Sequence, residues 1–416
     1  MTDLTWIDTA LKSARPQAMA ALLRFFRGDL DRADEAFQEA CLRALQNWPE
    51  KGPPRDPAAW LIFVGRNSGV DEGRRSRKHV ALPEEDILTD GEDVQDDMAE
   101  RLDGAQYRDD ILRLLFICCH PDLPNTQQIA LALRIVSGLT VAEIASAFLV
   151  SESAMEQRIT RAKRRIAEAG TEFATPGAVE RAGRLGVVAA MLYLLFNEGY
   201  SASGGEAHIR KPLCDEAIRL SRLLLRLFPS ETEIMGLTAL MLLQHARADT
   251  RLDGEGQIVL LEDQDRGRWD IGMITEGLAL LDKAMRHAKP GPMLVQAAIA
   301  ALHARAATAA DTDWVQIERL YATLEKIQPS PVITLNRAVA VLKASGPEAA
   351  LEMIAPLAPA LANYFYFYGV QGALLQELGR DEEARIAFDR AIALARTPAE
   401  AAHIRQHLDR LGQKTA

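Results

Sequence analysis

The chain has 416 residues, of which 48% are hydrophobic and 25% are charged, and its formal net charge is −10 at pH 7. Those fractions are typical of a globular protein, and the length is sufficient for two or three domains of ~150 residues. The acidic net charge excludes a basic nucleic-acid coat, so any DNA binding has to come from a local basic surface. Four cysteines indicate no disulfide framework, and no apolar run reaches the ~18 residues of a membrane span. We therefore expect a cytoplasmic protein with no membrane contact.

Alanine, leucine, arginine and glutamate dominate the sequence and β-branched runs are scarce, so we predict an all-α fold. Residues 1–80 form the first predicted domain. Apolar residues recur at helical spacing over 19–26, and a second helix is predicted over 31–47. Residues 48–57 contain four prolines and one glycine, which predicts a loop without helix. A third helix is predicted over residues 58–75.

An acidic segment follows, and we predict a linker over residues 81–109. The window 83–110 holds twelve acidic residues against two arginines, and few large apolar side chains interrupt it. Such a composition cannot bury enough apolar surface to fold and repels itself. The linker is therefore expected to be flexible and helical only toward its end.

The next predicted domain, residues 110–170, consists of two apolar helices, over 111–119 and 126–137, and a helix-turn-helix over 138–166. Thr140 with Glu143 fits a capping box, and so does Ser153 with Glu156, which gives both of its helices a start signal. The apolar residues 148–150 lie between these two helices. They are expected to pack the helices together.

Basic residues recur on the second helix of this motif. Arg158, Arg161 and Arg165 are spaced by three and four residues, so they share one helix face that a phosphate backbone could approach. This is the geometry of a major-groove reader. An ordinary helical hairpin with a solvated basic face is the alternative for this segment taken alone.

Residues 171–416 form the last predicted domain, which is helical and ends in a repeat. Ala338 and Gly372 are 34 residues apart, and so are Ala350 and Ala384, which matches the tetratricopeptide period of ~34 residues. The small and aromatic positions of that repeat are occupied by Gly372, Gly379, Ala384, Phe388 and Ala391. Weaker matches to the same repeat pattern occur at Ala217, Gly277, Leu281 and Ala284. A generic helical bundle with accidental spacing is the alternative.

Two polar clusters are not expected to carry chemistry. Residues 118–120 read Cys-Cys-His, but adjacent helical positions point ~100° apart and no second cysteine pair completes a metal site. The acidic residues within 260–266 are predicted to lie in a structural or docking loop, because no histidine or phosphate-binding glycine loop is near them. We expect no catalytic residue, no metal and no cofactor.

The first two domains, with their acidic linker, proline-rich loop and terminal helix-turn-helix, resemble a bacterial sigma factor of the extracytoplasmic-function group. The similarity covers roughly residues 10–168. It implies a protein that binds core RNA polymerase and promoter DNA and directs promoter-specific transcription initiation.

The family's polymerase-binding helix corresponds to residues 31–44, where family members show a similar acid-acid-apolar-Gln-Glu pattern. Acidic and amide side chains on a rigid helix suit a basic partner groove. The resemblance therefore assigns polymerase contacts to Asp34, Glu35, Gln38 and Glu39.

Residues 57–71 look like the family's next helix, which has Trp-Leu, then Ala/Gly-Arg-Asn, then Asp. The resemblance places this helix and the loop before it on the minus-10 promoter element, where a base is extruded from the duplex. The residues assigned to that element are Trp48, Arg55, Arg66, Asn67, Arg74, Arg75 and Arg77. Trp48 has a second interpretation, because an aromatic residue at a helix end more often fills the core.

The helix-turn-helix corresponds to the part of the family that reads the minus-35 element. Base contacts concentrate on the first turns of a recognition helix and on its entry. The residues assigned there are Ser151, Ser153, Ala154, Gln157, Arg158, Arg161 and Arg165. Glutamine suits adenine and arginine suits guanine, but the sequence does not assign individual bases.

Plain members of this family end soon after the helix-turn-helix, whereas this chain continues for about 240 residues. The extension resembles that of a subgroup with a tetratricopeptide-like C-terminal domain, which implies a regulatory region or a site for a protein or peptide partner. A one-component transcriptional regulator with a tetratricopeptide-like sensor is the main alternative, and a scaffold is another. A one-component regulator does not require the polymerase-binding helix or the helix that follows it. The presence of both therefore favours the sigma factor.

Overall fold

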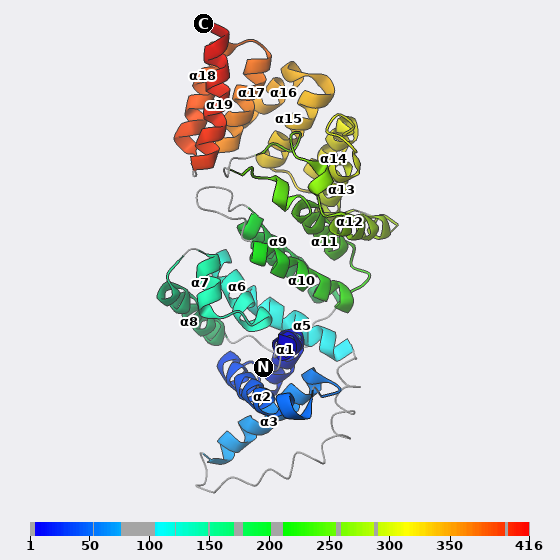
Figure 1. Cartoon of the computed structure of the whole chain (residues 1–416), viewed down its shortest axis with the longest axis vertical. Coiled ribbons are helices and arrows are strands. Elements are labelled where there is room, and N and C mark those ends of the chain that lie inside the picture. The colour runs from blue at the N-terminus through cyan, green and yellow to red at the C-terminus, as the bar shows by residue number, and fades with distance from the viewer. Residues whose placement is uncertain are drawn as a thin grey trace. The chain divides into compact units, whose positions relative to one another are not determined.

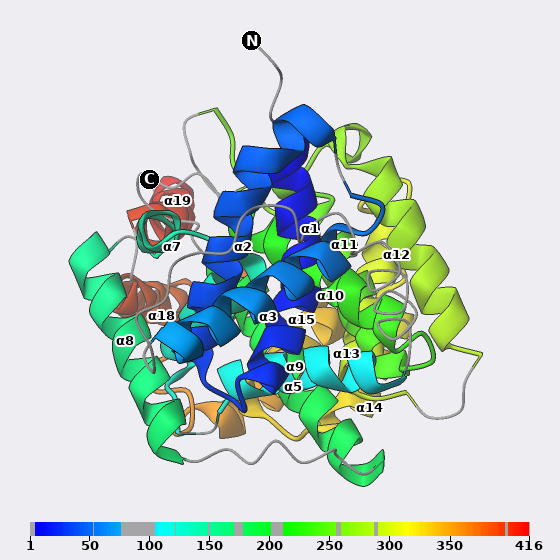
Figure 2. The same ribbon diagram turned by 90° about the horizontal axis from the view of Figure 1, so that it is seen from below.

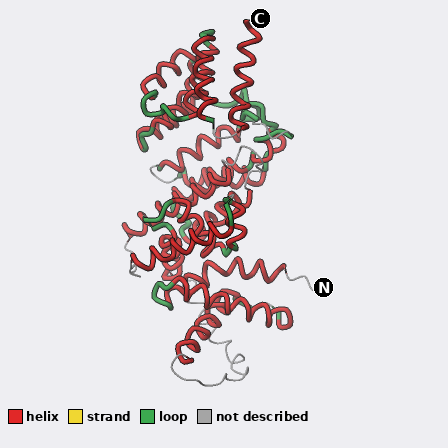
Figure 3. Tube along the Cα trace, turned by 90° about the vertical axis from the view of Figure 1, so that its left-hand side faces the viewer, coloured by secondary structure: helices red, strands yellow, loops and turns green. Residues whose placement is uncertain are grey.

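The structure is a computed structural model that describes residues 5–52, 54–75, 105–120, 122–148, 150–169, 178–200, 211–254, 259–286, 290–395 and 398–415. Within these ranges every regular element is a helix and none is a strand, which confirms the all-α prediction (Figures 1 and 3). No helix of the described part is long and apolar enough to cross a membrane. The chain divides into two compact units, Met1–Leu194 and Leu195–Ala416.

The first unit holds the helices of the predicted N-terminal domains and, in α9, the start of the predicted C-terminal domain. They are α1 (Thr5–Phe25), α2 (Leu30–Lys51), α3 (Pro57–Arg75), α5 (Ala105–Cys118), α6 (Asn125–Ala132), the π-helical turn η2 (Leu133–Ser137), α7 (Val141–Ala147), α8 (Glu152–Ala169) and α9 (Ala178–Tyr200), within which the division falls. Most of the predicted acidic linker, residues 81–104, lies outside the described residues; α5 begins within its last five positions.

Helices α1, α2 and α3 lie side by side and pack against one another (Figure 2). Their apolar positions recur at helical spacing, so each helix turns one apolar face inward. Met19 and Leu22 of α1, Phe37 of α2 and Leu61 of α3 are at most 2% exposed. This packing confirms the three helices that the sequence predicts for the N-terminal domain.

The second of these helices is longer than predicted. We expected it to end near residue 47 because prolines follow, but α2 continues to Lys51 and includes Pro49 in its last turn. A proline there removes one hydrogen bond. Trp48 nevertheless anchors the turn: its side chain is 2% exposed, and its carbonyl accepts a bond from Gly52 N at 2.9 Å. The prediction of a loop is therefore wrong for residues 48–51.

The second unit continues as an array of short helices. They are α10 (Lys211–Leu227), α11 (Thr232–His245), η3 (Ala248–Thr250), η4 (Arg266–Arg268), α12 (Ile271–Ala284), α13 (Pro292–Arg305), α14 (Trp314–Ile327), α15 (Pro331–Ser345), α16 (Pro347–Ile354), η5 (Ala355–Leu357), α17 (Phe365–Glu377), α18 (Asp381–Leu394) and α19 (Pro398–Thr415). From α10 onward each α-helix packs on the next along the chain, which is the organisation of repeat proteins.

Residues at the small and aromatic positions of the predicted repeat approach closely between α17 and α18. A Cβ atom added to Gly372 would lie 2.5 Å from the ring of Phe388, so only glycine permits this packing distance. Phe388 and Ala384 are fully buried beside the glycine. The assignment of this region to the tetratricopeptide family stays a prediction.

Candidate nucleic-acid and polymerase interface

Helix α2 carries the four residues predicted to bind polymerase. Asp29 caps its N-terminus by accepting a hydrogen bond from Arg32 N at 3.1 Å. Glu35 and Gln38 are exposed on its outer face, and Glu39 is half-buried and bonds Arg43 at 3.2 Å. These three residues are partly or wholly accessible to a partner.

Asp34, the fourth predicted contact, is buried, and only 5% of it is exposed. Its carboxylate lies 2.9 Å from the guanidinium of Arg15. Arg134 and Lys163 follow at 3.8 and 3.9 Å, and Lys163 also bonds Asp31 at 2.8 Å. The acidic start of α2 therefore faces basic residues of η2 and α8 within the first unit. A buried carboxylate needs such partners, because an unpaired charge is costly to remove from water.

Arg15 links three elements of this unit. It packs on the ring of Phe37, with 4.6 Å between its guanidinium carbon and the ring centroid, and donates to the carbonyl of Ile135 at 3.0 Å. Gly138 ends η2 with a φ of 76°, and a Cβ atom there would lie 2.6 Å from Arg15 Cδ. Burial lowers the pKa of Arg15, and the neighbouring charge of Asp34 opposes that shift.

Sequence reasoning missed Arg15 and Lys163 as partners of α2. Arg15 lies 119 residues from Arg134, and Lys163 lies 132 residues from Asp31. The only local signal is an arginine beside the apolar positions of the N-terminal helix. Pairing over such separations is set by tertiary packing.

Thr140 forms the predicted capping box at the start of α7. Its hydroxyl accepts from Glu143 N at 3.1 Å, and its backbone N–H donates to the Glu143 carboxylate at 2.7 Å. The hydrogen bonds from Thr140 lower the pKa of Glu143, first through the backbone N–H and then through the hydroxyl. The first half of the helix-turn-helix therefore begins where predicted.

Acidification should loosen the start of α7. Because its pKa is lowered in the fold, Glu143 contributes stability above its ordinary pKa of 4.5, and that contribution is lost as the pH falls through the folded value. Thr140→Ala should cost about 1 kcal/mol at neutral pH and reduce this dependence in part, because the hydroxyl is lost while the backbone N–H of residue 140 still donates to Glu143. Urea unfolding monitored at several pH values measures both effects, and an unchanged pH dependence in the variant would contradict them.

The second capping box, between Ser153 and Glu156, does not form, so this prediction is wrong. Helix α8 begins two residues earlier, and Ser151 caps it by accepting from Ala154 N at 3.3 Å. The earlier start places Met155 on the buried face, where it is fully enclosed. Packing therefore decides between two serines that are equally suitable as caps.

The basic face of α8 is accessible beside its buried side. Met155, Ile159, Ala162 and Ile166 form that buried side. Of the residues predicted to read the minus-35 element, the exposed ones are Ser151, Ser153, Gln157, Arg161 and Arg165, and the half-buried ones are Ala154 and Arg158. All seven therefore lie together along one accessible stretch, and the arrangement can approach a DNA groove.

Comparisons with known protein families identify the two predicted N-terminal domains. Residues 11–79 match the family described as sigma-70 region 2, and residues 113–166 match sigma-70 region 4. The chain belongs to the sigma-70 family of RNA polymerase sigma factors. This sigma factor carries both the polymerase-binding and the promoter-binding regions of its family, in the predicted order.

The extension of this sigma factor also has relatives. Residues 184–285 match a family of unknown function, DUF6596. An uncharacterized protein of Rhizobium meliloti (strain 1021) is 66% identical over 416 residues, which cover 100% of this chain and 98% of that protein. The similarity thus covers the sigma regions and the extension of this chain.

The predicted minus-10 residues of the sigma factor lie on α3 and the segment before it. Arg55 and Asn67 are exposed, and Arg66 is half-buried with its guanidinium carbon 4.6 Å from the ring centroid of Phe25. The backbone of Arg74 and Arg75 lies in α3, but their side chains are outside the described set, as is all of Arg77. The structure therefore brings together Arg66 and Asn67 on one helix.

Trp48 lies in an aromatic cluster of this sigma factor. Its ring centroid is 6.3 Å from that of Trp6, with nearly parallel planes, and 5.3 Å from that of Trp60. This is the core placement that we considered as the alternative to stacking on DNA. A base could reach Trp48 only if the cluster opened.

Three of the four cysteines are buried, and the fourth, Cys41, is half-buried on α2. Cys118, Cys119 and Cys214 are buried, and burial raises the pKa of Cys118 and Cys214 to about 12. A thiol with so high a pKa is a poor metal ligand and nucleophile at neutral pH. Among the described residues no group of histidine, cysteine and acidic side chains could hold a metal ion.

Proposed function

We propose that this sigma factor belongs to the extracytoplasmic-function subgroup and docks on core RNA polymerase through the outer face of α2. In this proposal α8 reads the minus-35 element while α3 and the segment before it hold the minus-10 element. The observation that carries the proposal is the accessible basic face of α8 in a chain that also matches region 2. The C-terminal unit, with its repeat-like packing, is proposed to modulate this activity.

Run-off transcription with purified core polymerase tests the proposal. Full-length protein, and a form shortened after residue 170, should give promoter-dependent products with at least one template selected by footprinting. Comparing the two forms measures what the extension contributes. Absence of promoter-dependent product with both forms would contradict the sigma assignment, and equal activity and promoter affinity of both would contradict the modulating role.

Charge reversal of Glu35 should weaken binding to core polymerase. Glu35 is exposed on α2, and like charges across an interface cost several kcal/mol, so Glu35→Lys should lower affinity at least ~tenfold. Glu348→Lys is the matched control, because Glu348 is exposed on α16. Polymerase titration by fluorescence anisotropy measures both variants. Equal affinities would remove this face of α2 from the interface.

Arg158→Ala should weaken binding to the selected promoter by about 1–3 kcal/mol if the guanidinium contacts a base edge. Arg164, which is exposed and lies 3.5 Å from Glu168, provides the comparison on the same helix. Holoenzyme binding should be measured on promoter DNA and on random DNA. An equal loss on both would show a phosphate contact instead.

A further inference from the structure

Two adjoining cavities lie within the second unit, among α11, α13, α14, α15 and the segment 259–269. Their volumes are about 210 and 530 Å³. They share the lining residues Leu261, His303, Tyr321 and Asn336, so they form one continuous depression, which we call the groove. The promoter-binding function uses none of it.

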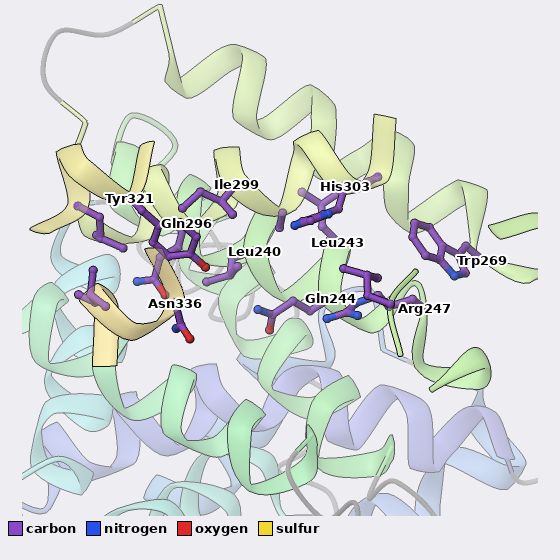
Figure 4. Close-up of a pocket in the computed structure, with 15 residues that line it drawn as sticks. Leu240, Leu243, Gln244, Arg247, Trp269, Gln296, Ile299, His303, Tyr321 and Asn336 are labelled. Atoms are coloured by element: carbon purple, nitrogen blue, oxygen red, sulfur yellow. The ribbon is translucent and has the colours of Figure 1, made fainter. Parts of the chain in front are cut away.

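The smaller cavity combines apolar walls with amide groups, and its side chains converge from several helices (Figure 4). Its apolar wall is formed mainly by Leu240, Leu243, Ile299 and Leu324. Its amide groups belong to Gln244, Gln296 and Asn336. Apolar walls with a few convergent polar groups are typical of binding sites.

The groove is positively charged. Arg247 lines the smaller cavity, and no acidic residue is among the described residues that line it. Arg266 lines the larger one, where it donates to the carbonyl of Ala306 at 2.9 Å and lies over the ring of Trp269. Burial and these two arginines lower the pKa of His303 to about 4, so this imidazole is neutral at pH 7. The two guanidinium groups therefore favour an anion in the groove.

A segment of the chain itself already lies at the groove. Leu261 lines both cavities, and the neighbouring Glu262 accepts a bond from Lys343 at 3.0 Å beside the larger one. The segment is held by Gln264, which donates to the carbonyl of Val259 at 3.1 Å. An apolar side chain followed by a carboxylate is thus one pattern that this surface accommodates.

We propose that the groove binds a peptide segment of a partner protein in which a carboxylate lies next to a large apolar side chain. The apolar side chain would pack against Leu243 and Ile299, and the carboxylate would meet Arg247. The chain's own Leu261 and Glu262 occupy the rim and compete with that peptide. This site goes beyond polymerase and promoter binding and does not depend on either.

The test uses a labelled synthetic peptide with the sequence of residues 259–266 and the full-length chain. The double variant Leu261→Ser, Glu262→Ser clears the rim and should bind the peptide at least ~tenfold more tightly than the wild type does. Adding Arg247→Gln or Arg247→Glu to that variant should weaken binding at least ~tenfold. Arg319 is an exposed cation on α14 outside the groove. Adding Arg319→Glu to the double variant should leave its affinity for the peptide unchanged.

Four results would overturn the proposal. The first is no peptide binding by the cleared variant. The second is an equal effect of the Arg247 and Arg319 changes, with circular dichroism confirming that the variants are folded. The third is binding of N-acetylglutamate as tight as that of the peptide, which would mark the groove as a site for small carboxylates. A peptide with glutamine in place of its glutamate should bind more weakly, and equal binding would also count against the proposal.

Discussion

Arg15→Met should destabilise the first unit by about 3 kcal/mol, because it leaves the buried carboxylate of Asp34 without its nearest cation. Breaking a buried ion pair costs about 3–5 kcal/mol. Arg134 and Lys163 remain 3.8 and 3.9 Å from that carboxylate, so the lower end of the range is expected. The variant also loses the bond from Arg15 to the carbonyl of Ile135.

Hydrogen exchange of the full-length protein at increasing urea measures this effect element by element. Peptides from α1, α2 and η2 should lose protection, while those from α17 and α18 serve as an internal reference. Lys12→Met is the matched control on α1, because the Lys12–Asp8 pair is exposed and such pairs contribute about 0–1 kcal/mol. If the double variant Arg15→Met, Asp34→Leu regains protection, the loss in Arg15→Met is due to the unpaired carboxylate of Asp34. Equal effects of the Arg15 and Lys12 changes would refute the role of the pair.

Phe388→Ala should destabilise the packing of α17 and α18 by about 3–5 kcal/mol, the cost of removing a buried phenylalanine side chain. Phe388 is fully buried, and its ring fills the space beside Gly372, where no other residue has room for a side chain. The ring also stacks on His407 of α19, with centroids 5.2 Å apart. Three helices therefore lose contacts in one substitution.

The same exchange measurement reports on this variant. Peptides of α17, α18 and α19 should lose protection, and those of α1 to α3 should keep it. Ile386 lies on α18 two residues away and is 69% exposed, so Ile386→Ala should change stability by no more than about 0.5 kcal/mol. If the two alanine variants behaved alike, the ring of Phe388 would not be the anchor of this helix pair.

The helices of this chain were largely predictable because their signals are local. Apolar spacing predicted α3, and the Thr140–Glu143 box marked the start of α7, the first helix of the helix-turn-helix. The spacing of small residues predicted the close approach of Gly372 to Phe388. Each of these signals lies within a short stretch of sequence or within one repeat period.

The errors arose where tertiary packing overrides a local rule. Burial of Trp48 holds a helical turn that includes a proline, and burial of Met155 selects Ser151 over Ser153 as the cap. The groove, and the pairing of Lys163 with Asp31, were not predicted from the sequence for another reason. Both depend on residues from distant helices, and one sequence without structure does not say which of them meet.

The position of Asp34 has a consequence for how polymerase binding would respond to salt. For the buried Asp34 to join the outer face of α2 in binding polymerase, the start of α2 must exchange its partners on α8 and η2 for the polymerase, and the apparent affinity is then the intrinsic one reduced by the fraction of molecules in which α2 is released. Salt screens the attraction of α2 to the polymerase, and it also weakens the contact of Asp31 with Lys163. The two effects oppose each other. The affinity of the whole chain for polymerase should therefore change less with ionic strength than the affinity of α2 alone.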